Sequence, residues 1–288
     1  MKKVLVIAAA AAVALSMAAC SSGPATSNGN AANAAAANSK APAGLITPGQ
    51  VSICIDPEYA PLEYFSNGTS GDIVGFDADG ARALAAKWGV KAVFQQTAFD
   101  GLMPALQAKR CDVMWSGLYV SANRTQVADA APYLATGPEL VVNTKNKDKI
   151  KKASDLCGKT IAAQSGGSNA AAAKAIGTDC VAKGKSNVTV TEYPQTAQTV
   201  LAVTNGKADA LVETDLAIPD MVSKSSGQLV EVLGVFPAST RTDFGVYTTK
   251  GGPLSAPVAA AIKAMIADGT LTTIADKYKV SADKLAKS

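Results

Sequence analysis

One order of strands and helices occurs twice in this chain, and this repetition restricts the fold more than any other feature. The first copy has predicted strands and helices, in alternation, at 51–56, 77–88, 90–95, 101–110 and 112–115. The second copy has them at 160–164, 168–183, 187–193, 195–205 and 208–212. Strands that are joined through a helix pair in parallel with right-handed crossovers. The sequence therefore predicts an α/β fold with two similar lobes.

The connections between the two copies predict a hinge. The chain enters the second copy through 139–144, and after it come a predicted strand and two predicted helices at 243–249, 254–267 and 271–278. Helices at the end of the chain need a sheet to cover, so we assign them to the first lobe. Two strands then cross between the lobes, which is typical of a hinged protein. We predict that lobe 1 comprises 48–137 and 242–288 and that lobe 2 comprises 138–241.

Composition excludes several kinds of chemistry. Of the 288 residues, 48% are hydrophobic and 17% are charged, so the chain can bury a sizeable core. Histidine is absent, which excludes serine–histidine and cysteine–histidine catalytic pairs and imidazole metal sites. The formal charge is only +4, and no basic stripe is interleaved with aromatic residues. We therefore expect no nucleic-acid partner, no metal and no cofactor.

The N-terminal segment predicts export and a lipid anchor. Residues 1–19 combine two lysines with a short apolar run, as in a signal peptide. An uncleaved membrane helix is the alternative, although the run is short for a bilayer. The sequence LSMAAC, which ends at Cys20, resembles a bacterial lipoprotein processing site and implies acylation of Cys20. Residues 20–47 are rich in alanine, asparagine and serine and predict a flexible tether.

Four further cysteines predict disulfides. Their number is even and the predicted compartment is oxidising, so bridges are favoured over buried free thiols. Three pairings are possible. We prefer Cys157–Cys180, which brackets one strand and one helix, together with Cys54–Cys111, which would tie two neighbouring strands.

A ligand site is predicted after the third strand. The apolar run at 113–115 ends in Ser116 and Gly117, and Arg124 follows one short loop later. Ligands of open α/β sheets bind just beyond the carboxyl ends of the strands. An arginine there can hold a carboxylate through two parallel hydrogen bonds. The alternative is a buried strand followed by an ordinary surface arginine.

Six motifs, taken together, resemble the polar amino-acid-binding proteins of ABC importers, which are extracellular solute-binding proteins of family 3. They are DPEYAP at 56–61, GFDAD at 75–79, FDGL at 99–102, SGLYVSANR at 116–124, QSGGSN at 164–169 and DGT at 268–270. The resemblance covers residues 50–280. It implies a periplasmic-binding-protein fold of type II, whose two lobes are joined by a two-strand hinge and close over an amino acid.

The resemblance also implies roles for individual residues. Arg124 would hold the ligand carboxylate, helped by the helix start at Gly167, Ser168 and Asn169. Ser116 and Gly117 would receive the ammonium group. Tyr59 and Phe99 would wall the ligand side chain, and Asp56 would meet its far end, which slightly favours a basic or amide side chain. The implied ligand-binding set is Asp56, Tyr59, Phe99, Ser116, Gly117, Tyr119, Arg124, Gln164, Gly167, Ser168, Asn169, Thr214 and Asp215.

One position departs from the family pattern. The acid that pairs with the ligand ammonium falls on Thr214, with Asp215 one residue later and Glu213 one earlier. A one-residue shift on a strand turns a side chain to the other face. Either the loop readjusts so that Asp215 reaches the ligand, or the ammonium relies on lobe 1, or the ligand has no ordinary ammonium.

The resemblance leads to three functional hypotheses. The favoured one is a monomeric, non-enzymatic receptor, lipid-anchored in the periplasm or on the outer face of the cytoplasmic membrane, that delivers a free polar amino acid to the membrane subunits of an ABC permease. The second is an enzyme on the same fold, similar to cyclohexadienyl dehydratase, for which Glu213 is the nominated general acid. The third is a ligand sensor without transport.

Overall fold

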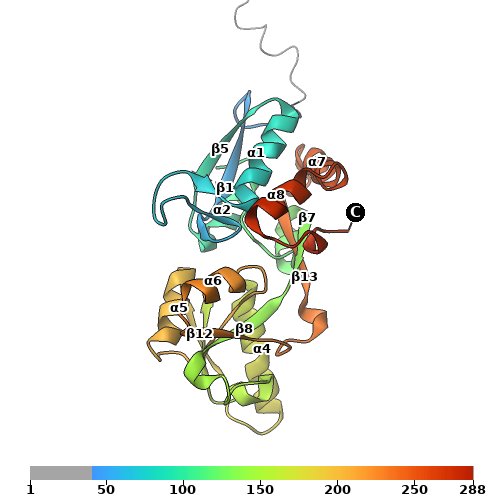
Figure 1. Cartoon of the computed structure of the whole chain (residues 1–288). Coiled ribbons are helices and arrows are strands. Elements are labelled where there is room, and N and C mark those ends of the chain that lie inside the picture. Colours follow the sequence, from blue (N-terminus) through green and yellow to red (C-terminus); the bar gives the residue numbers. More distant parts are fainter. Residues whose placement is uncertain (1–40, 288) are drawn as a thin grey trace, which may run out of the picture. The chain divides into compact units, whose positions relative to one another are not determined.

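The computed structural model describes residues 41–287 (Figure 1). The predicted signal peptide, Cys20 and most of the predicted tether lie outside the described residues. Two five-stranded mixed sheets form the two lobes, and a three-stranded antiparallel sheet accompanies the first.

Lobe 1 is built on a sheet with the strand order β5-β1-β6-β13-β7. Its strands are β1 (Gln50–Ile55), β5 (Lys91–Gln96), β6 (Val113–Met114), β7 (Ala128–Thr136) and β13 (Thr242–Thr249). Its helices are α1 (Phe76–Trp88), α2 (Leu102–Gln107), α3 (Ala122–Val127), α7 (Ser255–Ala267) and α8 (Thr270–Tyr278). The three-stranded sheet consists of β2 (Glu58–Tyr59), β3 (Glu63–Phe65) and β4 (Ile73–Val74).

Lobe 2 is built on a sheet with the strand order β10-β9-β11-β8-β12. Its strands are β8 (Pro138–Asn143), β9 (Thr160–Gln164), β10 (Thr189–Tyr193), β11 (Ala210–Thr214) and β12 (Leu229–Val232). Its helices are α4 (Ser168–Ala182), α5 (Thr196–Thr204) and α6 (Ile218–Lys224).

The two sheets follow one plan. In each, three strands pair in parallel, β5-β1-β6 in lobe 1 and β10-β9-β11 in lobe 2. A fourth strand, β13 or β8, pairs antiparallel with the last of these, and an edge strand, β7 or β12, pairs antiparallel with the fourth. The chain crosses from lobe 1 to lobe 2 between β7 and β8, and it returns between β12 and β13. The predicted fold class, two similar α/β lobes with two crossings, is confirmed.

The predicted elements differ from the observed ones mainly at their ends. The observed helix α2, Leu102–Gln107, is shorter than the helix predicted at 101–110. The sequence did not predict β7, β12, α3, α6 or the small sheet. Residues of the predicted tether also differ: Ala41 and Leu45 pack against the core of lobe 1, and the Ile46 amide donates to Asp112 Oδ1 at 2.7 Å. The ordered part of lobe 1 therefore starts before residue 48.

Both preferred disulfides are present. Cys54 bonds to Cys111 and Cys157 bonds to Cys180. Each lobe thus carries one bridge. Cys54 lies in β1 and Cys111 just before its neighbour β6, whereas the second bridge ties helix α4, which contains Cys180, to the segment before β9, which contains Cys157.

Each lobe has its own apolar core. The core of lobe 1 is rich in large side chains such as Trp115 and Tyr133, whose rings meet edge to face with centroids 5.4 Å apart. The core of lobe 2 is built mainly from Val, Ile, Leu and Ala. Within residues 41–287, no single helix has the length and apolarity to span a membrane; α7 and α8 reach that length only as a pair, bent by 71°.

Candidate functional site

The carboxyl end of β6 carries the first part of the site. Ser116 Oγ accepts a hydrogen bond from the Asp56 amide and donates one to Glu63 Oε1, both at 2.9 Å. Gly117 has a φ of 51°, which favours glycine, and a Cβ there would come within 3.1 Å of the Tyr59 ring. The Gly117 amide donates to Asp77 Oδ2 at 2.8 Å. The strand end is therefore held rigidly, with the Tyr59 ring packed on its backbone.

Arg124, in the first turn of α3, reaches from lobe 1 to lobe 2. Its Nη1 donates to the Tyr119 carbonyl at 2.9 Å and lies 3.4 Å from Ser168 Oγ, and its Nη2 donates to the Gly166 carbonyl at 3.2 Å. Burial lowers the pKa of the Arg124 guanidinium below its ordinary value. A guanidinium is still charged at neutral pH. The cation of lobe 1 therefore faces the start of α4, where free amides and the helix dipole favour an anion.

Tyr59 makes a second contact between the lobes. It lies in β2, and its hydroxyl donates to Glu213 Oε1 at 2.5 Å and lies 2.6 Å from Thr214 Oγ1, at the end of β11 in lobe 2. Glu213 and Thr214 are adjacent at the buried end of β11, and both contact this one hydroxyl. The alternation of faces along a strand therefore does not separate these two residues here.

Glu213 is the functional candidate that the expected ligand set omitted. Its side chain is 3% exposed, and burial raises its pKa to about 7 although Tyr59, the Thr214 amide and Asn169 donate hydrogen bonds to it. Asn169 Nδ2 is the third donor, at 3.1 Å. The sequence does carry a signal, since an acid directly follows the apolar run 210–212, but that signal predicts a general acid of an enzyme as readily as a ligand-binding group.

Asp215 has different surroundings. Its carboxylate accepts hydrogen bonds from Arg241, from Lys284 at 2.7 Å and from Thr136 at 2.7 Å. Burial by itself raises the pKa of Asp215, but these three donors outweigh burial and hold it below its ordinary value. Asp215 is thus paired by two cations beside the strands that cross between the lobes.

Three acids, Asp56, Glu58 and Asp100, lie near the start of β2. Burial, together with the charges of Glu58 and Asp100, raises the pKa of Asp56 to about 7, although a hydrogen bond from the Phe99 amide opposes the rise. Glu58 Oε1 also accepts a hydrogen bond from Gln164 Nε2 of lobe 2, at 3.4 Å. The charges of Glu58 and Asp100 beside Asp56 form a region of negative potential, which favours a cationic group.

The remaining expected residues contribute less to this picture. Tyr119 packs its ring on Phe244, with centroids 4.9 Å apart, and its buried hydroxyl has no hydrogen-bond partner among residues 41–287. Gly167 caps the start of α4. Within the same residues, no group of three acids or cysteines is placed to hold a metal ion. The structure thus brings Tyr59 to Gly117 and Thr214, Arg124 to Ser168, and Asp56 to Ser116, while Asp215 faces the crossing strands.

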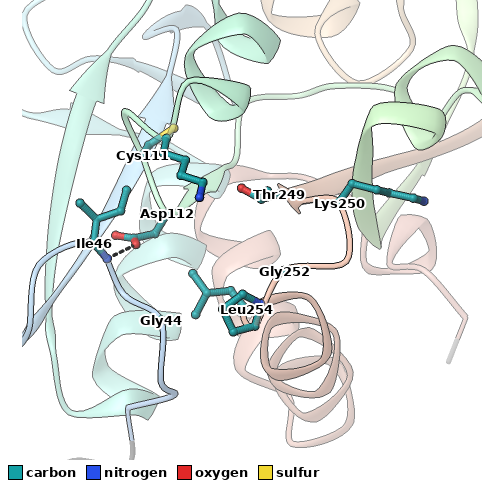
Figure 2. Close-up of a pocket in the computed structure, with 10 residues that line it drawn as sticks. Gly44, Ile46, Cys111, Asp112, Thr249, Lys250, Gly252 and Leu254 are labelled. Atoms are coloured by element: carbon teal, nitrogen blue, oxygen red, sulfur yellow. Dashed lines mark hydrogen bonds between the residues drawn. The ribbon is translucent and has the colours of Figure 1, made fainter.

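One groove lies beside these residues, and one further cavity lies away from them. A groove of about 620 Å³ has the Tyr59, Tyr64 and Phe65 rings on one side and residues of α5 and α6 on the other. A cavity of about 340 Å³ lies in lobe 1 near Gly44, Asp112 and Leu254, and none of the expected ligand residues lines it (Figure 2). The groove therefore borders the candidate site, and the second cavity does not.

Two α/β lobes of one plan, joined by two crossings and contacting each other through polar side chains, define a two-lobed binding protein of type II. The sequence profile of the bacterial extracellular solute-binding proteins, family 3, matches residues 51–281. The chain belongs to this family.

Individual relatives agree with this class. The L-cystine-binding protein TcyJ of Escherichia coli K12 is 29% identical over 232 residues, which are 80% of this chain and 82% of that protein. An ancestral arginine-binding protein bound to arginine has a TM-score of 0.72 and 28% identity, with 80% of this chain and 98% of that chain covered. The ancestral amino acid-binding protein AncCDT-1, a precursor of cyclohexadienyl dehydratase, has a TM-score of 0.70 and 29% identity, with 80% and 95% covered.

Proposed function

We propose that this protein is a monomeric receptor outside the cytoplasm that closes on a free polar amino acid and delivers it to the membrane subunits of an ABC permease. The observation that carries the proposal is Arg124, whose guanidinium lies against Ser168 and Gly166 of the other lobe. A carboxylate bound there would contact the guanidinium of lobe 1 and the start of α4 in lobe 2 together. One ligand group would thus stabilise the closed form.

The ligand class follows from charge. Asp56, Glu58 and Asp100 lie together, and burial and mutual repulsion raise the pKa of Asp56. A basic side chain relieves that repulsion, and an amide can donate hydrogen bonds to the same oxygens. We therefore propose a basic or amide amino acid. The arginine-bound structure of an ancestral relative supports a basic ligand.

Closure is a shift between two populations, and it needs contacts to both lobes. A micromolar dissociation constant corresponds to roughly 8 kcal/mol. A bidentate, desolvated arginine–carboxylate pair and packing on Tyr59 and Phe99 can contribute much of that amount.

The test is calorimetric titration of the full chain with the twenty L-amino acids. We expect micromolar or tighter binding of one basic or amide amino acid, and a loss of about 100-fold or more for Arg124→Ala, because a charge-assisted bidentate pair is removed. Arg124→Lys keeps the charge but not the planar fork, so it should restore only part of the affinity.

The matched control is Arg110→Ala, since Arg110 is exposed in lobe 1. Affinity like that of the wild type in Arg124→Ala would remove the carboxylate assignment. Loss of uptake of the bound amino acid in a deletion strain would support transport, and unchanged uptake would support a sensor.

Glu213 is the one feature that favours an enzyme instead. A buried carboxyl group with a pKa of about 7 has the properties of a general acid. We nevertheless propose a non-enzymatic receptor, because the relatives named above are described as binding proteins. Formation of product from prephenate or arogenate would overturn this.

We also propose that the protein is exported and held to a membrane by acyl chains on Cys20. The motif that ends at Cys20 supports this. Cys20→Ala should move the protein from the membrane pellet to the soluble fraction. Retention in the pellet would contradict the anchor.

A further inference from the structure

Two acids are buried beside the strand end that carries Ser116 and Gly117. Glu63, in β3, is 1% exposed, and Asp77, in the first turn of α1, is 0% exposed. Among residues 41–287, neither acid forms an ion pair with a lysine or an arginine. A buried charge is costly unless it is paired. Two neighbouring acids without a cation therefore need another way to limit their charge.

One oxygen of each acid holds the strand end. Ser116 Oγ donates to Glu63 Oε1 at 2.9 Å, and the Gly117 amide donates to Asp77 Oδ2 at 2.8 Å. The Tyr133 hydroxyl donates to the same Asp77 oxygen at 2.7 Å. The two acids therefore fix two consecutive residues just after β6.

The other oxygen of each acid has only the neighbouring acid as a partner. Glu63 Oε2 and Asp77 Oδ1 are buried, and no donor among the described residues bonds to either. The two carboxyl groups form a hydrogen bond with each other. Because an ionised carboxylate can only accept, such a bond forms only if one of the two groups carries a proton. The contact between Glu63 and Asp77 therefore contains one proton.

Glu63 is the acid that keeps this proton. Burial, followed by the charge of Asp77, raises the pKa of Glu63 well above its ordinary value, although the hydrogen bond from Ser116 opposes the rise. Burial raises the pKa of Asp77 only to about 6, because Tyr133, the Gly117 amide and the other acid donate hydrogen bonds to it. The start of α1 also favours a negative charge there. At neutral pH, Asp77 is therefore ionised and Glu63 is protonated.

Two further titratable groups face the pair, and neither is a cation. Besides burial and Asp77, the charge of Asp56, just after β1, raises the pKa of Glu63. Burial raises the pKa of Tyr133, in β7, well above its ordinary value, so its hydroxyl stays protonated and donates to Asp77. The proton on Glu63 thus limits the charge of the pair.

We propose that Glu63 and Asp77 share one proton, which Glu63 holds at neutral pH, and that Glu63 thereby positions Ser116 for ligand binding. The hydrogen bonds run in one direction, from Ser116 to Glu63 and from Glu63 to Asp77. Because the one hydroxyl hydrogen of Ser116 is donated to Glu63, Ser116 Oγ can only accept hydrogen bonds from other groups, as it does from the Asp56 amide. Glu63 is a positioning residue, and its effect on binding rests on the proposed function.

The first measurement is calorimetric titration at pH 7 with each of the twenty L-amino acids that the wild type binds. Glutamine keeps an acceptor for Ser116 and supplies an N–H donor for Asp77, as a protonated glutamate does, so Glu63→Gln should bind within about 3-fold of the wild type. Methionine has a similar length but neither group, so Glu63→Met should bind about 10-fold more weakly or worse. The matched control is Glu192→Gln, an exposed acid of lobe 2 that is paired with Lys174; its affinity should equal that of the wild type.

The second measurement is infrared spectroscopy at pH 7, which locates the proton. The spectrum of the wild type minus that of Glu63→Gln should contain the carbonyl stretching band of one buried, protonated carboxyl group. Protonated fractions of Asp56 and Glu213 contribute to both spectra and cancel. Ser116→Ala should move the band to higher frequency, because the Ser116 hydroxyl no longer donates to Glu63 Oε1.

A difference spectrum without this band would overturn the shared proton. Equal losses of affinity in Glu63→Gln and Glu63→Met, or a band that does not move in Ser116→Ala, would overturn the positioning of Ser116. The shift of the band tests this link even if Glu63→Met does not fold. A wild type that binds none of the twenty amino acids would overturn the proposed function, whereas the infrared spectra would still decide the shared proton.

Discussion

Two acids two residues apart, Glu213 and Asp215, join the lobes in different ways. Glu213 meets Tyr59 of lobe 1 through neutral donors, and burial raises its pKa. Asp215 meets Arg241 and Lys284, and these cations keep its pKa low in spite of burial. The partners of an acid, and not its residue type, therefore decide its charge state. The neutral donors leave Glu213 without a positive charge beside it, whereas the double ion pair gives Asp215 two.

The sharpest test of this difference is the pH dependence of stability at Glu213. An acid whose folded pKa lies above its unfolded pKa contributes stability at low pH, and this contribution is lost as pH rises through the folded pKa. In the ligand-free wild type, this loss between pH 5 and pH 8 should reach up to about 3 kcal/mol of unfolding free energy, since folding raises the pKa of Glu213 from 4.5 to about 7. Glu213→Gln has no carboxyl group at this position and should not show the loss.

Urea unfolding of both proteins at the two pH values measures this loss, with Glu192→Gln as the control for removing one carboxyl group. If the difference in unfolding free energy between Glu213→Gln and the wild type stays constant from pH 5 to pH 8, folding does not raise the pKa of Glu213.

The next largest effect should follow from Asp215→Asn. The Asp215 side chain is 14% exposed, and its loss leaves Arg241 and Lys284 without their acid. The unfolding free energy at pH 7 should fall by about 2 kcal/mol. A lowered folded pKa means that this stability is present above the unfolded pKa and is lost as pH falls through the folded value, so the effect should shrink below about pH 4.

Lys284→Met serves as the graded control for Asp215→Asn, because Arg241 remains on the acid. Its cost at pH 7 should be smaller than that of Asp215→Asn. An equal cost would show that Arg241 contributes nothing to the pair.

The smallest effect should come from Lys224, an exposed contact between the lobes. Its Nζ lies 5.9 Å from the Tyr64 ring centroid and 2.7 Å from Asp220, and its side chain is 65% exposed. Water screens such contacts, so Lys224→Ala should change unfolding free energy by no more than about 0.5 kcal/mol. Thermal or urea unfolding checks this, and a loss similar to that of Asp215→Asn would mean that burial does not separate these contacts.

The sequence predicted the central elements well, but it missed strands β7 and β12. Strand β9 has the predicted bounds, and α1, α4 and β13 begin or end within one residue of theirs. The sequence did not predict strand β7, because Pro132 lies within it and proline disfavours a strand. In the sheet Pro132 pairs with Gly245, where the register of β13 shifts. That irregularity arises from pairing with a segment more than a hundred residues away, so no local pattern reveals it.

The candidate site was predicted in the same uneven way. Arg124 and Ser168 were expected in one site and do meet. The alternation of faces along a strand predicts that Glu213 and Thr214 have different contacts. At the end of β11, however, both side chains contact the Tyr59 hydroxyl. The ligand roles of the thirteen expected residues stay predictions that the titrations above can test.

By itself, the sequence determined the repeated α/β plan and the position of Arg124 after its strand, because these depend on local periodicity and on chain order. The even number of cysteines favoured disulfides but left three pairings possible. Only the tertiary structure decided which partners each of the two acids, Glu213 and Asp215, has in the other lobe. Tyr59 and Glu213 are 154 residues apart, and Asp215 and Lys284 are 69 apart. Partners at such distances come together only when both sheets have formed, and these partners set the charge of each acid.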